Sequence, residues 1–228
     1  MTEQNMRGTV VLLSGGMDSC VLLAKTVNEC DADNVVALSV DYGQRHWVEL
    51  EAARAIALHY EVEHIVVPLG ALVTGVFTGN QSSQLNPSVE VPHGHYADDT
   101  MRATVVPNRN MILLSLATAA AVSRRYAAVA YAAHAGDHAV YPDCRRVFAD
   151  SMADAMQLCD YDAIQLRRPF IGMSKAEVCR LGADLAAPLG LSYSCYEGGP
   201  QHCGKCGTCV ERKEAFADAG VDDPTDYA

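Results

Sequence analysis

Residues 9–19 read TVVLLSGGMDS, an apolar run followed by a glycine-rich turn. Its apolar start, 9–13, is rich in β-branched residues and predicts a buried strand. Ser14, Gly15 and Gly16 predict a tight turn after the strand, and the apolar spacing over 18–30 predicts a helix. A strand that turns sharply into a helix is the first unit of an α/β fold with a parallel sheet.

Strands and helices continue to alternate along the chain. Further strands are predicted at 34–41, 63–69, 127–133 and 163–166, and further helices at 47–60, 111–123, 143–158 and 174–187. This order predicts an α/β fold built on a doubly wound parallel five-stranded sheet. The aperiodic segment 70–104 predicts a functional lid or a mobile loop, and 222–226 predicts a solvated tail. We expect a nucleotide-binding domain over 1–190 and a zinc-binding C-terminal segment over 191–228.

The composition of the chain argues against a nucleic-acid-binding protein and against a membrane protein. The chain has 228 residues, and 28 acidic against 17 basic residues give a net charge of −11. Such a charge disfavours a general binder of nucleic acid, whose affinity depends on neutralising phosphates. No apolar run approaches the ~18 residues of a membrane-spanning helix, and the first apolar run is too short for a signal peptide. We therefore expect a cytoplasmic protein with no membrane partner.

The turn at 14–19 predicts an anion site. Glycines allow close approach of a ligand to the backbone, and the following helix offers unpaired N–H groups and the positive end of its dipole. The order of residues is neither that of a Walker loop nor that of the dinucleotide fingerprint. The alternative is a glycine-rich turn that binds nothing. The spacing S-G-G-x-D-S resembles the pyrophosphate loop of the N-type ATP pyrophosphatases, which implies that ATP binds here and that Asp18 orients Mg²⁺.

Four of the nine cysteines lie close together as Cys195-x7-Cys203-x2-Cys206-x2-Cys209. Four thiolates suit a closed, structural Zn²⁺ site. His202 as a ligand, an iron–sulfur cluster and free thiols are the alternatives. The remaining cysteines are scattered, and we expect those in predicted helices to be buried and inert; they are Cys20, Cys30, Cys159 and Cys179.

Three polar segments follow predicted strands or the long loop: DYGQRH at 41–46, PNRN at 107–110 and HAGDHAVYPDCR at 134–145. Doubly wound folds bind ligands at the carboxyl ends of their strands, so these segments are candidates for a site. Arg109 could pair with a carboxylate or a phosphate. Cys144 is a candidate nucleophile, whereas His134 and His138 are each more often structural than catalytic.

The motifs at 14–19, 41–46, 141–145, 194–199 and 203–209 together look like those of the 7-cyano-7-deazaguanine synthase family, over about 9–216. The resemblance implies an adenine nucleotide alpha hydrolase-like fold, one zinc on the four clustered cysteines, and small-molecule partners with a homodimer as the family expectation. Asn108 stands where many members have Gly, and 134–138 departs from a version that contains Glu. The implied ATP loop comprises Leu13, Ser14, Gly15, Gly16, Met17, Asp18, Ser19, Cys20, Val21, Leu22 and Leu23.

The implied reaction converts 7-carboxy-7-deazaguanine, ammonia and ATP to 7-cyano-7-deazaguanine, through an adenylated carboxylate and an amide. A tRNA sulfurtransferase of the same superfamily is one alternative, but it would need a reactive cysteine pair and a basic surface. A zinc-knuckle nucleic-acid-binding module is another, and it leaves the phosphate loop unexplained. The candidate catalytic residues are Asp18, Ser19, Arg109, Asp137 and Lys175.

Overall fold

The computed structural model describes residues 8–70, 75–95 and 99–228. One parallel sheet has the strand order β3-β2-β1-β4-β5, which confirms the predicted doubly wound five-stranded sheet. Strands β2 and β3 lie on one side of β1, and β4 and β5 lie on the other. The strand order therefore reverses between β1 and β4, and folds of this kind bind ligands at such a point. None of the described helices is long and apolar enough to cross a membrane. The strands are β1 (Thr9–Leu12), β2 (Val35–Asp41), β3 (Glu63–Pro68), β4 (Ala128–Ala130) and β5 (Gln165–Arg167).

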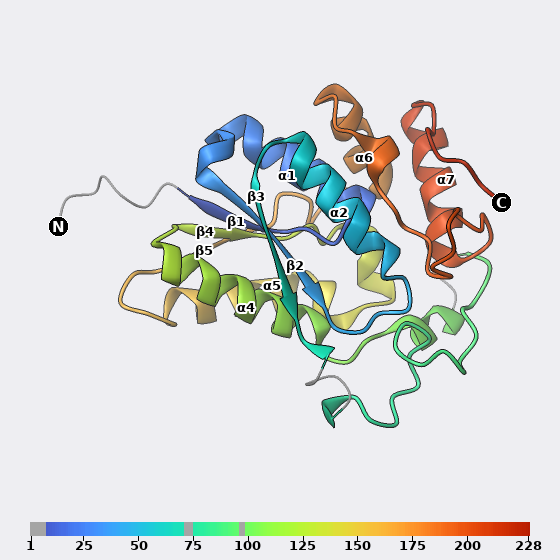
Figure 1. The fold of residues 1–228 in the computed structure, drawn as a ribbon, viewed down its shortest axis with the longest axis horizontal. Coiled ribbons are helices and arrows are strands. Elements are labelled where there is room, and N and C mark those ends of the chain that lie inside the picture. The colour runs from blue at the N-terminus through green and yellow to red at the C-terminus, as the bar shows by residue number, and fades with distance from the viewer. Residues whose placement is uncertain (1–7, 71–74, 96–98) are drawn as a thin grey trace.

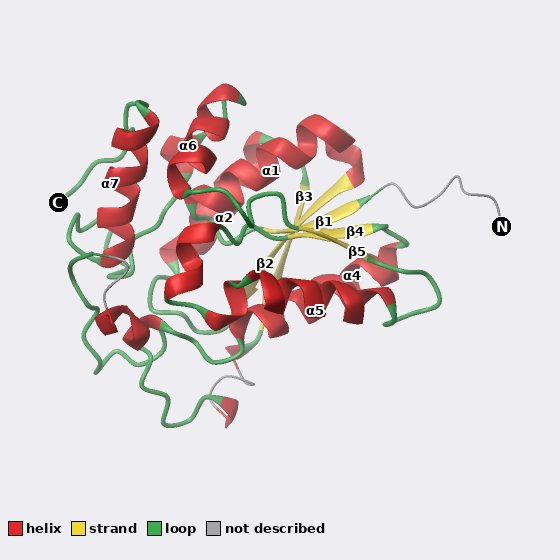
Figure 2. Cartoon of the chain, turned by 180° about the vertical axis from the view of Figure 1, so that it is seen from behind, coloured by secondary structure: helices red, strands yellow, loops and turns green. Residues whose placement is uncertain are grey.

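Helices cover both faces of the sheet (Figures 1 and 2). Neighbouring residues of a strand point to opposite faces, so Val10 packs in the core under α4, whereas Val11 packs in the core under α1. Burial on both sides explains why the strands read as continuous apolar runs. One face carries α1 (Met17–Cys30), α2 (Val48–His59) and α6 (Lys175–Asp184); the other carries α4 (Arg109–Arg124) and α5 (Arg146–Gln157).

The last described helix was not predicted from the sequence. This helix, α7 (Gly207–Ala219), packs against α6, and its Ala215 and Phe216 lie in the same core as α1. The guanidinium of Arg212 is buried and donates to Ser192 Oγ at 2.9 Å and to Thr225 Oγ1 at 2.7 Å.

The expected solvated tail at 222–226 is folded back on the protein. Arg212 Nε lies 3.5 Å from Asp223 Oδ1, and Tyr227 donates to Asp223 Oδ2 at 2.6 Å. The prediction of a solvated tail holds for Asp222, Pro224 and Asp226, which are exposed, but not for Asp223 and Thr225, which contact the buried Arg212.

Arg45 anchors much of the expected loop at 70–104. Its guanidinium donates to the backbone carbonyls of Pro87 and Val89 at 3.1 Å each, and its own N–H donates to Gln84 O at 2.8 Å. Ser83 and Gln84 are buried. Residues 82–89 are therefore a packed part of the fold, and the expectation of a mobile loop is wrong for them; 71–74 and 96–98 lie outside the described residues.

Candidate active site

The phosphate loop begins where β1 ends. Gly15 has φ +93°, and a Cβ there would lie 2.0 Å from the backbone oxygen of Glu49, so no other residue fits without a shift. Ser14 Oγ accepts the Gly16 N–H at 3.3 Å, and Ser19 Oγ accepts the Gly15 N–H at 3.2 Å. Gly16 is the N-cap of α1. The loop therefore sits on a helix N-terminus, as an anion site requires.

Only the first part of the predicted ATP loop reaches the cavity above it. Ser14, Gly16 and Asp18 line this cavity, together with Leu13, Met17 and Ser19. Gly15 turns away toward α2. The side chains of the second part lie in the hydrophobic core and hold α1 on the sheet; they are Cys20, Val21, Leu22 and Leu23.

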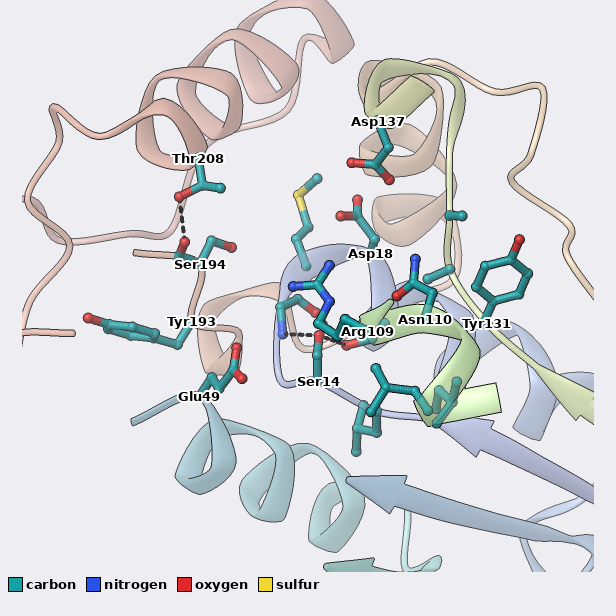
Figure 3. A pocket seen from close by; sticks show the side chains of 18 of the residues that line it. Ser14, Asp18, Glu49, Arg109, Asn110, Tyr131, Asp137, Tyr193, Ser194 and Thr208 are labelled. Carbon is teal, nitrogen blue, oxygen red and sulfur yellow. Dashed lines mark hydrogen bonds between the residues drawn. The ribbon is translucent and has the colours of Figure 1, made fainter. Parts of the chain in front are cut away.

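The cavity lies at the carboxyl ends of β1, β2 and β4, where the strand order predicts a ligand. Figure 3 shows Ser14 and Arg109 between two groups of side chains. Tyr131 and Asn110 lie on one side, near the apolar residues at the strand ends. The other side is polar and comprises Glu49, Tyr193, Ser194 and Thr208.

Lys175 joins two carboxylates at the edge of the cavity. Its Nζ lies 2.9 Å from Asp18 Oδ2 and 2.9 Å from Glu211 Oε2. Burial opposes charge on both Asp18 and Lys175, but their attraction outweighs it, so the pKa of Asp18 lies below its ordinary value and that of Lys175 lies well above. Burial raises the pKa of Glu211 despite its contact with Lys175. Sequence analysis missed Glu211 because it missed α7.

His134 contacts Asp137 through both its ring and its backbone N–H. Its Nδ1 accepts the Gly136 N–H at 3.1 Å, so the ring proton lies on Nε2, which is 3.6 Å from Asp137 Oδ2. Asp137 Oδ2 also accepts the backbone N–H of His134 at 3.3 Å. His134 is fully buried, which favours the structural role among those left open by the sequence. Asp137 lines the cavity.

Arg109 starts α4 and lines the cavity. Its guanidinium lies 5.8 Å from the ring centroid of Tyr141, and it forms no ion pair with a carboxylate within 8–70, 75–95 and 99–228. The charge is thus available to an anionic ligand. Asn108, before it, has φ +57°, a left-handed conformation that glycine adopts freely, which is compatible with the glycine expected at this position from the sequence resemblance.

Cys144 lines the cavity, but its surroundings favour the neutral thiol over the nucleophilic thiolate. Burial, reinforced by the charge of Asp137, raises its pKa well above the ordinary value, and Asn110 Nδ2 donates to its sulfur at 3.2 Å. The expectation of burial holds for Cys20 and Cys179, but Cys159 is exposed in the turn after α5 and Cys30 is half-buried. The prediction of burial was therefore wrong for Cys159.

The four clustered cysteines form a candidate metal centre. Their Sγ atoms all lie within 4.8 Å of one another, and those of Cys203 and Cys209 are 3.9 Å apart. Tetrahedral Zn²⁺ with bonds of ~2.3 Å separates its sulfurs by about 3.8 Å, so the cluster fits such an ion. The N–H of Cys206 donates to Cys203 Sγ at 3.3 Å. His202 lies outside the group, because its Nε2 accepts the Ser194 N–H at 3.0 Å.

Comparison with known proteins shows which family the chain resembles over most of its length. The family model for "Queuosine biosynthesis protein QueC" matches residues 8–220. A 7-cyano-7-deazaguanine synthase of Hahella chejuensis is 45% identical over 218 residues, 96% of this chain and 92% of the relative. One of Rhizobium meliloti is 47% identical over 225 residues, 96% of this chain and 91% of the relative.

A solved structure has a similar fold. It is that of the NMN synthetase from Francisella tularensis, with a TM-score of 0.55 and 16% identity over 95% of this chain and 79% of that one. At this identity the likeness concerns the fold alone, and the family assignment depends on the sequence matches. The resemblance found in the sequence motifs is thereby confirmed, and the chain belongs to the Queuosine biosynthesis protein QueC family.

Proposed function

We propose that this protein is an ATP-dependent carbon–nitrogen ligase of queuosine-type 7-deazapurine biosynthesis, which converts 7-carboxy-7-deazaguanine and ammonia to 7-cyano-7-deazaguanine. Family membership over 8–220 and relatives of that name at 45–47% identity support it. The observation that carries the proposal is one cavity that joins an anion-binding helix N-terminus to Arg109, which has no carboxylate partner among the described residues.

The chemistry requires two activations. The substrate carboxylate attacks the α-phosphate of ATP and pyrophosphate leaves; ammonia then displaces AMP and loses a proton to give the amide. The amide oxygen attacks a second ATP, pyrophosphate leaves again, and loss of AMP with the nitrogen protons gives the nitrile. The same anion site serves both steps, because each develops charge on a departing pyrophosphate.

We assign a separate role in these steps to each group of residues in the cavity. The N-terminus of α1 holds the pyrophosphate, and Ser19 shapes the loop by accepting the Gly15 N–H and donating to Gly16 O. Arg109 neutralises charge on the carboxylate or the α-phosphate, and Asp137 is a second candidate contact. Lys175 is occupied by two carboxylates, so we propose that it positions Asp18.

Two metal ions fit the described residues. Asp18 Oδ1 is buried and has no hydrogen-bond partner within them, as a ligand atom for Mg²⁺ would be. Bound there, Mg²⁺ would supply positive charge beside the ATP phosphates. We propose Zn²⁺ for the four cysteines, where it would fix the start of α7 and with it Thr208 and Glu211.

Other expectations from the sequence remain proposals. We propose a cytoplasmic enzyme of small metabolites without a nucleic-acid partner, in line with the charge of −11. The homodimer implied by the family and the division into 1–190 and 191–228 stay predictions. The apolar contacts of α7 with the core around α1 indicate that the two parts fold together.

The test is an assay with purified protein, 7-carboxy-7-deazaguanine, ammonium and MgATP, followed by mass spectrometry. We expect the nitrile, and the amide when ATP is limiting. Arg109→Met should lower turnover by about 100-fold, the scale of losing one charge-stabilising group. Arg54→Met is the matched control, because Arg54 is an exposed partner of Glu51 on α2. Absence of both products from the wild type would overturn the proposal.

A further inference from the structure

The polar side of the cavity holds a carboxylate fixed in one orientation. Glu49, in the first turn of α2, accepts from Gln44 Nε2 at 2.9 Å through Oε1, and its Oε2 lies 3.0 Å from His46 Nε2. Gln44 is itself held, because its Oε1 accepts the Tyr42 N–H at 3.0 Å. The Glu49 side chain is 13% exposed and lines the cavity. Its orientation is therefore set before any ligand arrives.

This corner presents hydrogen-bond acceptors. His46 Nε2 faces the Glu49 carboxylate and donates to it, and the other ring nitrogen, Nδ1, is buried and without a partner among the described residues. Glu49 forms no ion pair with lysine or arginine within 8–70, 75–95 and 99–228. A ligand at this corner must therefore bring N–H donors.

The position of Glu49 argues against a phosphate ligand on this side. The Glu49 side chain lines the same cavity as Ser14 and Gly16, so its carboxylate would repel a phosphate bound next to it. The charge of Asp18 is offset by Lys175, but among the described residues no lysine or arginine pairs with Glu49. Figure 3 shows Glu49 on the side of Ser194 and Thr208, with Ser14 and Arg109 between it and Tyr131.

We propose that Glu49 is a specificity-determining residue that accepts the two adjacent N–H groups of a 2-amino-4-oxopyrimidine ring, the ring N–H and the 2-amino group. This inference rests on the proposed function, whose substrate carries that ring. A carboxylate and two parallel N–H donors make a planar bidentate pair, which needs no cationic ligand. Ser14 and Arg109 lie next to Glu49 on the way to Tyr131 (Figure 3), so a substrate held in this way would direct its carboxylate end toward them.

Calorimetry tests the pair without turnover. The ligands are 7-cyano-7-deazaguanine and its analogue without the 2-amino group, titrated into wild type, Glu49→Gln and the matched control Glu51→Gln. Glu51 is on the same helix with a side chain 55% exposed. We expect wild type and Glu51→Gln to prefer the 2-amino ligand by about 10- to 100-fold, the scale of a charge-assisted hydrogen bond, and Glu49→Gln to lose most of this preference.

Further measurements make each outcome decisive. Melting temperature and ATP affinity show whether Glu49→Gln is folded, and Glu49→Asp, which keeps the charge but shortens the side chain, should also reduce the preference. Equal preference in wild type and Glu49→Gln overturns the inference and leaves the proposed function standing. A raised KM for ammonium with the preference unchanged also overturns it, since Glu49 would then serve ammonia. Failure of wild type to bind either ligand overturns the proposed function and, with it, this inference.

Discussion

Lys175 and Asp18, 157 residues apart in the chain, meet with Nζ 2.9 Å from Oδ2. Lys175 is the first residue of α6, and Asp18 is in the first turn of α1. Glu211 of α7 completes the group. Helices α1, α6 and α7 are thus joined at the edge of the phosphate loop, and the position of the loop depends on all three.

Lys175→Met should destabilise the protein by about 3–5 kcal/mol, because it leaves two buried carboxylates without their cation. Lys25→Met is the matched control: Lys25 pairs with Glu29 on an exposed helix surface, where a pair contributes about 0.5 kcal/mol or less. Urea unfolding of both variants measures the difference. Equal losses of unfolding free energy in the two variants would contradict a buried, coupled role for Lys175.

Glu211→Gln should change how stability depends on pH. Burial raises the folded-state pKa of Glu211 above its ordinary value of 4.5. The folded wild type therefore binds more protons than the unfolded chain between the two values, and its stability falls as pH rises through this window. We expect wild type to lose stability relative to Glu211→Gln from about pH 4.5 upward. Unfolding curves from pH 5 to 8 test this, with the exposed Glu214→Gln as control; a relative gain for wild type would have the wrong sign.

Gly15→Ala should disrupt the phosphate loop. The new Cβ would lie 2.0 Å from Glu49 O at φ +93°, whereas Gly43 has a similar φ of +76° with nothing within 4 Å. Gly43→Ala therefore isolates the cost of the left-handed backbone, about 1–2 kcal/mol. We expect Gly15→Ala to lose about 4 kcal/mol or more, together with ATP binding. Comparable unfolding free energies for the two variants would refute the close contact.

Cys206→Ala should lose the metal and most of the soluble yield. Structural zinc contributes ~10–16 kcal/mol in small peptides, so the loss of one ligand is severe. Metal analysis of the wild type should give one zinc per chain. Cys159→Ala, at an exposed cysteine outside the cluster, should keep the metal. Finding iron and sulfide in the purified wild type would contradict the zinc prediction and indicate an iron–sulfur cluster on these cysteines.

ATP should be split to AMP and pyrophosphate, with two ATP consumed for each nitrile. A helix N-terminus that holds the departing pyrophosphate favours attack at the α-phosphate. Chromatography of nucleotides during turnover measures the ratio, and limiting ammonia should let the adenylated carboxylate accumulate. ADP and phosphate as the nucleotide products would exclude this route.

The sheet and the phosphate loop could be predicted because their signals are local. A β-branched run before Ser14, Gly15 and Gly16 specifies strand, turn and helix within a few residues. The strand expected over 127–133 shortens to Ala128–Ala130, the length over which β4 pairs with its neighbours. Residues 131–133 instead line the cavity. Their apolar sequence looks the same as that of a strand, so the sequence pattern could not separate the two.

Helix α7 shows why the rest of the site could not be predicted. Its buried face includes the charged residues Glu211 and Arg212. The pattern of apolar and polar residues therefore does not show which face of this helix is buried. Each of the two contacts a residue distant in sequence: Glu211 forms an ion pair with Lys175, and Arg212 donates to Ser192. Such pairs have no local pattern, and only the folded chain reveals them.

The contacts of Arg45 have a consequence for how the sequence can change over time. Its guanidinium holds backbone carbonyls at Pro87 and Val89, and every amino acid supplies a carbonyl. The side chains that face solvent near these positions can therefore drift among descendants of this chain without loss of the anchor. An inserted or deleted residue would move the carbonyls out of register with the guanidinium. We expect related chains to vary in identity along this stretch while they keep its length.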